Sequence, residues 1–105
     1  MTDWTYASAA ETAKALAGKK ISSVELTQQV IGRIERFDKA LNAVCVRDFD
    51  RALDAARAAD AALAKGETKP LLGVPMTVKE SFNLAGTATT WGFPHAKDYV
   101  APEDA

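Results

Sequence analysis

The chain has 105 residues, enough for one domain with a single hydrophobic core. Its composition, 48% hydrophobic and 26% charged, is typical of a folded soluble protein and is too apolar for a disordered tail. The formal net charge of -1 provides no long-range field that would attract nucleic acid, an anionic membrane or a polyacidic substrate. We therefore expect a small, roughly neutral ligand as the partner, and no nucleic acid or membrane.

Targeting segments and metal-binding motifs are not evident in the sequence. The amino terminus lacks a basic segment followed by an apolar stretch, and no run of about 18 apolar residues occurs, so we expect a cytoplasmic protein. The single cysteine, Cys45, excludes an internal disulfide, and its apolar neighbours predict a buried, unreactive side chain. The single histidine, His95, is predicted to be a solvated loop residue. We expect neither a metal ion nor a cofactor.

Two helices are predicted to begin near residues 9 and 23. Each start has a capping box, Ser8 with Glu11 and Ser22 with Glu25, which satisfies backbone donors that the first turn leaves free. The first helix is alanine-rich and is expected to stop at Gly18.

The second helix carries an apolar stripe that is predicted to form one buried face. Leu26, Val30, Ile34 and Phe37 recur at spacings of four, four and three residues, and polar side chains lie between them. The simplest interpretation is a packing helix of a larger core. The alternative is a non-catalytic interaction module that dimerises through this face.

The middle of the chain predicts a βαβ unit. Residues 41–46 and 71–78 are short and apolar, as buried strands are, although Pro75 lies inside the second, so the strand proper is expected from Met76 onward. The alanine-rich segment 50–65 between them predicts a helix that lies close against a sheet. Two parallel strands do not make a stable sheet, so the other strands are expected to come from elsewhere.

These elements predict an α/β fold in which helices pack on a mixed sheet that is incomplete in this chain. Residues 1–40 form a helical part, 41–79 the βαβ unit and 80–105 an irregular border of an active site. Together they are interpreted as the amino-terminal fragment, 1–105, of a single domain. An irregular stretch of about 20 residues is uncommon unless it is functional or disordered.

Few residues are candidates for catalysis. The chain has four serines, of which Ser8, Ser22 and Ser23 look like helix-capping residues, and no nucleophile elbow or phosphate-binding loop surrounds any of them. Lys79 differs because it follows the second apolar strand, and open α/β sheets bind ligands at the carboxyl ends of strands. A lysine acts as a base only after its ammonium loses a proton, which burial or neighbouring cations favour. The simpler alternative is a surface lysine that pairs loosely with Glu80.

The segment 70–92, PLLGVPMTVKESFNLAGTATTWG, resembles the lysine-bearing segment of the amidase signature family. The matching positions are Gly73, Val74, Pro75, Val78, Lys79, Glu80, Gly86, Thr89, Thr90 and Gly92. The preceding elements fit the opening of that family in order and length, so the resemblance covers nearly the whole chain. Residues 80–83 look more like the broad-specificity amidases of the family than its tRNA-dependent amidotransferase members.

The resemblance implies hydrolysis of an amide to a carboxylic acid and ammonia or an amine. Lys79 would be the base of a serine, cis-serine, lysine triad, and Thr89, Thr90 and Trp91 are expected to contact the small-molecule amide substrate. Both catalytic serines and the oxyanion loop lie beyond Ala105 in relatives, and Ser81 is a candidate for neither role. The chain is therefore expected to be inactive without the remainder of the amidase domain.

Two further expectations accompany this resemblance. The first is self-association as a homodimer or another homo-oligomer. The second is an alternative within the family, the amidotransferase component that releases ammonia from glutamine.

Overall fold

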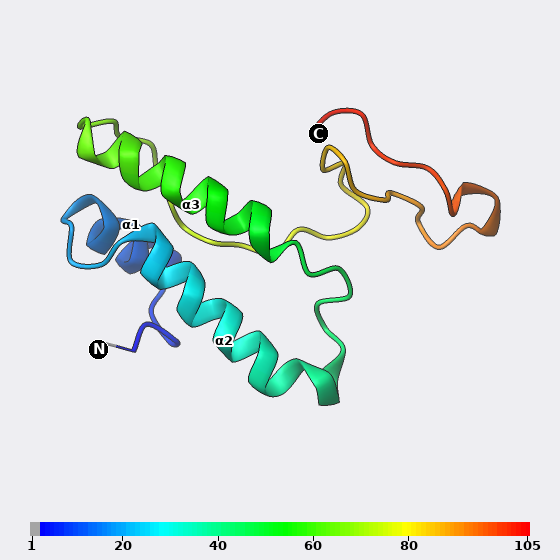
Figure 1. Ribbon diagram of the computed structural model, residues 1–105, viewed down its shortest axis with the longest axis horizontal. Helices are drawn as coiled ribbons and strands as arrows, with labels where there is room; N and C mark the ends of the chain where they lie inside the picture. Colours follow the sequence, from blue (N-terminus) through cyan, green and yellow to red (C-terminus); the bar gives the residue numbers. More distant parts are fainter. Residues whose placement is uncertain (1–2) are drawn as a thin grey trace. The chain divides into compact units, whose positions relative to one another are not determined.

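The computed structural model describes residues 3–105 of a chain that divides into two compact units, Met1–Pro75 and Met76–Ala105. The first unit contains the helices α1 (Ala9–Ala17), α2 (Ser23–Leu41) and α3 (Phe49–Ala64), and the second contains a short 3-10 helix, η1 (Pro94–Ala96). Figure 1 shows the three long helices followed by an irregular chain. No helix in residues 3–105 is both long and apolar enough to cross a lipid bilayer.

Local capping sets the starts of α1 and α2, as predicted. The hydroxyl of Ser8 accepts a hydrogen bond from the Glu11 N–H over 3.2 Å, and Glu11 accepts one from the Ser8 N–H over 2.8 Å. Ser22 and Glu25 repeat this reciprocal pair over 3.1 and 2.9 Å. Both capping boxes are confirmed, and α1 ends before Gly18 as expected.

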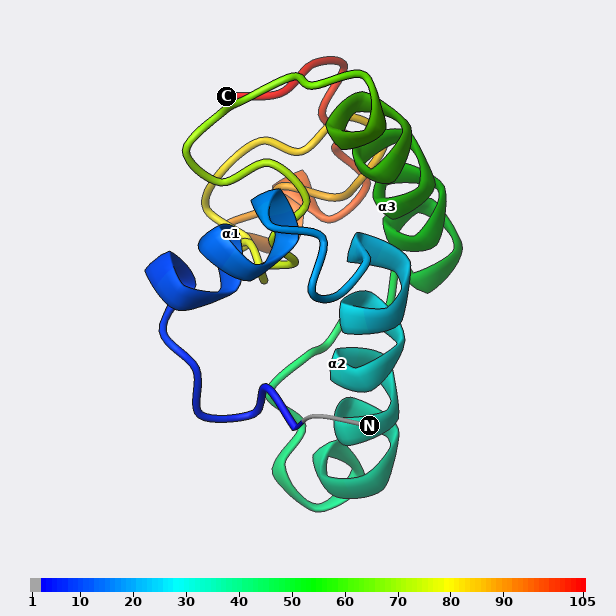
Figure 2. The same cartoon turned by 90° about the vertical axis from the view of Figure 1, so that its left-hand side faces the viewer.

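Helices α2 and α3 pack against each other and run antiparallel, as Figures 1 and 2 both show. The buried residues of α3 are Ala56 and Ala59, whose small side chains allow close approach of the two backbones. The alanine-rich face was predicted to lie on a sheet, but it faces a helix instead. The hydrophobic core of this unit consists of Ala15, Leu16, Ile21 and Leu26, with Trp4, Leu63 and Val74 packed against it.

The apolar stripe of α2 is buried at only one end. Leu26 is 4% exposed, whereas Val30 is 37% exposed and Phe37 is 44% exposed. The ring of Phe37 lies beneath the guanidinium groups of Arg33 and Arg36, at 5.3 and 4.9 Å. The prediction of one continuous buried face is therefore wrong within this unit, whereas Thr27 and Asp38 of the same helix are buried.

The first predicted strand, 41–46, is not formed. Leu41 still belongs to α2, and Asn42 has a left-handed backbone, with φ of 51°, that ends the helix. The carboxylate of Asp38 then accepts hydrogen bonds from the N–H groups of Ala43 and Val44, which fixes a loop where a strand was expected. Cys45 lies in this loop and is exposed, so the prediction of a buried thiol is also wrong.

The second predicted strand, 71–78, is likewise absent. A turn holds its first half, with the N–H of Val74 donating to the Leu71 carbonyl over 3.1 Å and Gly73 at φ of +83°. Residues 74–79 have no regular secondary structure, and Pro75 has no N–H to donate. A β-ladder requires lateral partners, so the mixed sheet has no counterpart in residues 3–105.

The second unit is irregular, but backbone hydrogen bonds pair residues 87–89 with residues 99–101. One antiparallel bridge joins Ala88 and Val100. On either side of it, Thr89 N–H donates to the Tyr99 carbonyl over 3.2 Å, and Ala101 N–H donates to the Thr87 carbonyl over 2.9 Å. The chain that follows Gly86 therefore returns on itself through η1.

Candidate functional site

Lys79 lies at the end of the irregular stretch 74–79 that follows the Gly73 turn. Its side chain is exposed, and its carbonyl accepts a hydrogen bond from the Phe82 N–H over 3.0 Å as the chain turns. Within residues 3–105 the Lys79 ammonium makes no ion pair, so the expected loose pairing with Glu80 is not formed. This chain therefore presents the amine to solvent and does not itself enclose it.

Glu80 binds backbone groups ten and eleven residues further along the chain. Its Oε1 accepts a short hydrogen bond from the Thr90 N–H, and its Oε2 accepts one from the Trp91 N–H over 3.1 Å. The hydrogen bonds from Thr90, first its backbone and then its side chain, together with the one from Trp91, hold the pKa of the Glu80 carboxyl below its ordinary value. The carboxylate thereby fixes the Thr90 backbone to the residue that follows Lys79.

The three predicted substrate contacts differ in exposure. Thr89 is 6% exposed, and its buried hydroxyl finds no hydrogen-bond partner among the described residues. Thr90 is half-buried, and its hydroxyl accepts a hydrogen bond from the Gly92 N–H over 3.3 Å. Trp91 is 65% exposed. Only Trp91 presents a large side-chain surface that a ligand could reach.

Three of the four serines serve the fold. Ser8 and Ser22 are N-caps, as predicted, whereas the Ser23 hydroxyl donates to the Gly73 carbonyl over 2.7 Å and is buried. Ser23 is therefore not a capping residue, because its hydroxyl connects α2 to the segment that leads to Lys79. These roles occupy the hydroxyl groups that a nucleophile would need.

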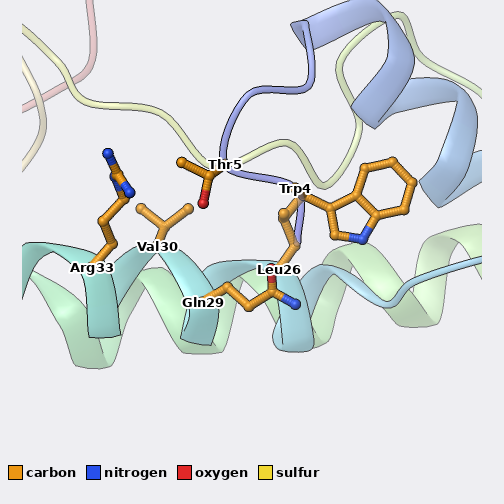
Figure 3. Close-up of a pocket in the computed structure, with 6 residues that line it drawn as sticks. All are labelled: Trp4, Thr5, Leu26, Gln29, Val30 and Arg33. Carbon is orange, nitrogen blue, oxygen red and sulfur yellow. The ribbon is translucent and has the colours of Figure 1, made fainter. Parts of the chain in front are cut away.

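A small hollow in the first unit contains none of the candidate residues. It has a volume of about 100 Å³ and lies where Trp4 and Thr5 cover one side of α2, as Figure 3 shows. Leu26, Val30 and Arg33 form the helix side of this hollow, with Gln29 at its edge. A cavity of this size is smaller than the roughly 300–1,000 Å³ of small-molecule sites. In the part of the chain that the structure describes, no group of three or more histidine, cysteine, aspartate or glutamate side chains is placed to hold a metal ion.

The sequence singles out Lys79 as a candidate but does not reveal the contacts of its neighbour Glu80. From the sequence, Glu80 is an ion-pair partner of Lys79 or the acidic position of the family segment. Glu80 and its partner Thr90 are ten residues apart in a segment without helical or strand periodicity, so the sequence pattern does not reveal their hydrogen bond. The one local signal was the Trp91-Gly92 dipeptide, because a glycine after a loop residue often marks a tight turn.

Comparison with known proteins places this chain in a family. A family model described as Amidase matches residues 25–105. The A subunit of the glutamyl-tRNA(Gln) amidotransferase of Aromatoleum aromaticum (strain DSM 19018 / LMG 30748 / EbN1) is 48% identical over 99 residues, which cover 94% of this chain and 20% of that protein. Its counterpart in Moraxella catarrhalis is 42% identical over 105 residues, covering 100% of this chain and 21% of that protein.

The chain is also similar to a solved structure. That structure belongs to a vestigial protein complex that reveals the evolutionary origins of an s-triazine catabolic enzyme, and it matches with a TM-score of 0.82 and 30% identity over 90% of this chain and 21% of that one. The chain thus spans about a fifth of the length of these relatives. Because the family model covers residues 25–105, including the segment around Lys79, the chain belongs to the amidase family.

Proposed function

We propose that this chain is the lysine-bearing part of an enzyme that hydrolyses an amide C–N bond, with Lys79 as the base. The observation that carries the proposal is that the whole segment 70–92, with its Gly-Val-Pro turn and its threonine pair, lies inside the region matched by the Amidase model. The remainder of the domain, about four-fifths of a relative's length, supplies the other catalytic groups.

The proposed reaction follows the triad that the family resemblance implies. The neutral amine of Lys79 takes a proton from a bridging serine, which deprotonates the nucleophilic serine as that oxygen attacks the amide carbonyl carbon. The C–N bond breaks, the nitrogen leaves with a proton as ammonia or an amine, and an acyl-enzyme ester remains. Water then hydrolyses the ester and releases the carboxylic acid. The hydroxyls of Ser8, Ser22 and Ser23 are engaged in the fold, and the family resemblance gives Ser81 neither catalytic role, so both serines are assigned to the remainder.

Lys79 needs a drier environment than this chain provides. A lysine in water is protonated, and its neutral form is favoured only by burial or by nearby positive charge. The exposure of Lys79 therefore requires that the remainder of the domain cover it. The exposed apolar side chains on either side of it, Met76, Val78 and Phe82, fit a surface that a larger core would bury.

Two kinds of amide-cleaving enzyme fit this reaction. The sequence pattern at residues 80–83 favoured a broad-specificity amidase. The relatives at 48% and 42% identity belong to glutamyl-tRNA(Gln) amidotransferases, which favours the alternative of an ammonia-releasing component. Both alternatives share cleavage of an amide C–N bond. The cytoplasmic location and the homodimer expected from the sequence stay predictions.

A domain graft tests this function. Residues 1–105 replace the matching fifth of the Aromatoleum aromaticum relative, and ammonia release is measured with glutamine and with simple aliphatic and aryl amides. We expect activity in the graft, its loss in Lys79→Ala, and none in the 105-residue chain alone. Lys97→Ala is the matched control, because Lys97 is also an exposed lysine of the second unit. Near-normal turnover in Lys79→Ala would remove this lysine from the mechanism.

A further inference from the structure

The backbone conformation of Trp91 is unusual for its residue type. Trp91 has φ of 55° and Gly92 has φ of 74°, and the N–H of Phe93 donates to the Thr90 carbonyl over 2.9 Å. Positive φ at both central positions is the pattern of a type I′ turn, which normally takes asparagine, aspartate or glycine. A bulky side chain in the left-handed region costs about 1–2 kcal/mol, so other contacts must hold Trp91 there.

Glu80 provides those contacts. Its two carboxylate oxygens accept the N–H groups of Thr90 and Trp91, the two residues that enter the turn. Charge-assisted hydrogen bonds of this kind are roughly twice as strong as those between neutral groups. The hydrogen bond from the Thr89 N–H to the Tyr99 carbonyl also fixes the chain that leads into the turn.

This arrangement also affects the neighbouring lysine. A carboxylate that pairs with an amine favours its protonated form, which is the wrong form for a base. The Glu80 carboxylate instead binds backbone N–H groups, and no ion pair with Lys79 is formed among the described residues. The acid next to the candidate base is thus directed toward the turn.

We infer that Glu80 is a positioning residue, which holds the Thr90-Trp91 turn in its left-handed conformation so that the indole of Trp91 forms part of the amide-binding surface. This inference rests on the proposed function. The exposed ring of Trp91 offers an apolar face, which fits the carbon skeleton of an amide substrate. Thr89, whose side chain is buried, is assigned no contact with the substrate.

The first experiment examines the turn without any assay of activity. Amide NMR spectra of the full chain are compared for wild type, Glu80→Gln and Glu103→Gln, the last being an exposed acid of the same unit. In the wild type we expect downfield Thr90 and Trp91 amide protons that move upfield as Glu80 is protonated at low pH. Glu80→Gln should lose both the downfield position and the titration, whereas Glu103→Gln should keep them. Identical Thr90 and Trp91 shifts in all three proteins would overturn the inference.

The second experiment measures the catalytic consequence in the active graft. Displacement of a binding group by about 1 Å costs about 10²-fold in rate, so Glu80→Gln should lower kcat/KM by about that factor, mostly through KM. Glu80→Asp keeps a carboxylate and should recover part of the loss in kcat/KM. Both substituted grafts should still unfold in one cooperative thermal transition. If the Lys79→Ala graft is inactive while the Glu80→Gln and Glu103→Gln grafts have the same kcat/KM, the positioning role fails and the proposed function stands. If Lys79→Ala stays active, the proposed function fails regardless of the NMR result.

Discussion

The carboxylate of Asp60 in α3 caps the first residue of α2, where its Oδ1 accepts a hydrogen bond from the Ser23 N–H over 2.6 Å. Its Oδ2 accepts the next N–H, that of Val24, over 3.1 Å. With the Glu25 N–H bound to the Ser22 hydroxyl, the free donors of the first turn are satisfied from two sides. One of these caps is local in sequence, and the other comes from a separate helix and holds α2 and α3 together.

Removal of the Asp60 carboxylate should destabilise the first unit. Asp60→Ala leaves two helix N-terminal donors without an acceptor, so we expect a loss of about 1–2 kcal/mol in the free energy of unfolding. Urea unfolding followed by circular dichroism measures this loss. Asp54→Ala on the same helix is the control, because its ion pair with Arg57 is exposed and should contribute less than about 1 kcal/mol. Equal effects of the two substitutions would contradict the capping role.

Gly73 and Gly32 should respond to alanine in opposite directions. At Gly73, with φ of +83°, an added Cβ would lie 3.2 Å from the Ser23 side chain and 3.5 Å from the Ala59 Cβ. Gly32 lies within α2, and an added Cβ meets nothing within 4 Å there. We expect Gly73→Ala to lower the free energy of unfolding by at least about 1 kcal/mol and Gly32→Ala to raise it by about 0.5–1 kcal/mol. A stabilising Gly73→Ala would show that the turn before Lys79 is not held against α2 and α3.

The stability of the loop after α2 should depend on pH through Asp38. Hydrogen bonds from the Ala43 and Val44 backbones, together with Arg47, lower the pKa of the buried Asp38 carboxyl. A lowered folded-state pKa means that the stabilisation is complete above the unfolded value, about 3.9, and is lost as pH falls through the folded value.

Asp38→Asn isolates this effect from other acids with lowered pKa values, such as Glu11 and Glu25. The wild type should be more stable than the variant near neutral pH, and the difference in unfolding free energy should shrink below about pH 4. Urea unfolding at a series of pH values measures it. A difference that stays constant across this range would exclude the carboxylate as the source.

The helices could be predicted because their signals are local. The two capping boxes and the stop at Gly18 involve residues within one or two turns, and α3 (Phe49–Ala64) begins within one residue of its predicted start. The strands could not be predicted correctly, because a ladder depends on partners far away in sequence and an apolar run alone does not specify them. The interactions of Asp38 and Asp60 were missed for a related reason, since acidic residues inside a helical pattern are usually assigned to its solvated face.

The sequence motif singles out Lys79 as a candidate, but it does not reveal the contacts around it. A dense motif identifies a residue, but the contacts of its neighbours depend on how the loop folds back, as the ten-residue span from Glu80 to Thr90 shows. Trp91 illustrates the same limit. Nothing in its residue type predicts a left-handed backbone, which depends on Gly92 and on the Glu80 carboxylate.

Asparagine at position 91 should make the turn more stable and the site less effective. Asparagine tolerates the left-handed region and is preferred before glycine in a type I′ turn, so Trp91→Asn should relieve about 1 kcal/mol of strain. Slower hydrogen exchange of the Phe93 amide, which donates to the Thr90 carbonyl, measures this change. Gly92→Ala is the opposing control, because its φ of +74° strains an alanine although its Cβ would meet no neighbour. If the Trp91 indole contacts the substrate, the active graft carrying Trp91→Asn should show a higher KM despite its firmer turn. An unchanged KM would confine Trp91 to a structural role.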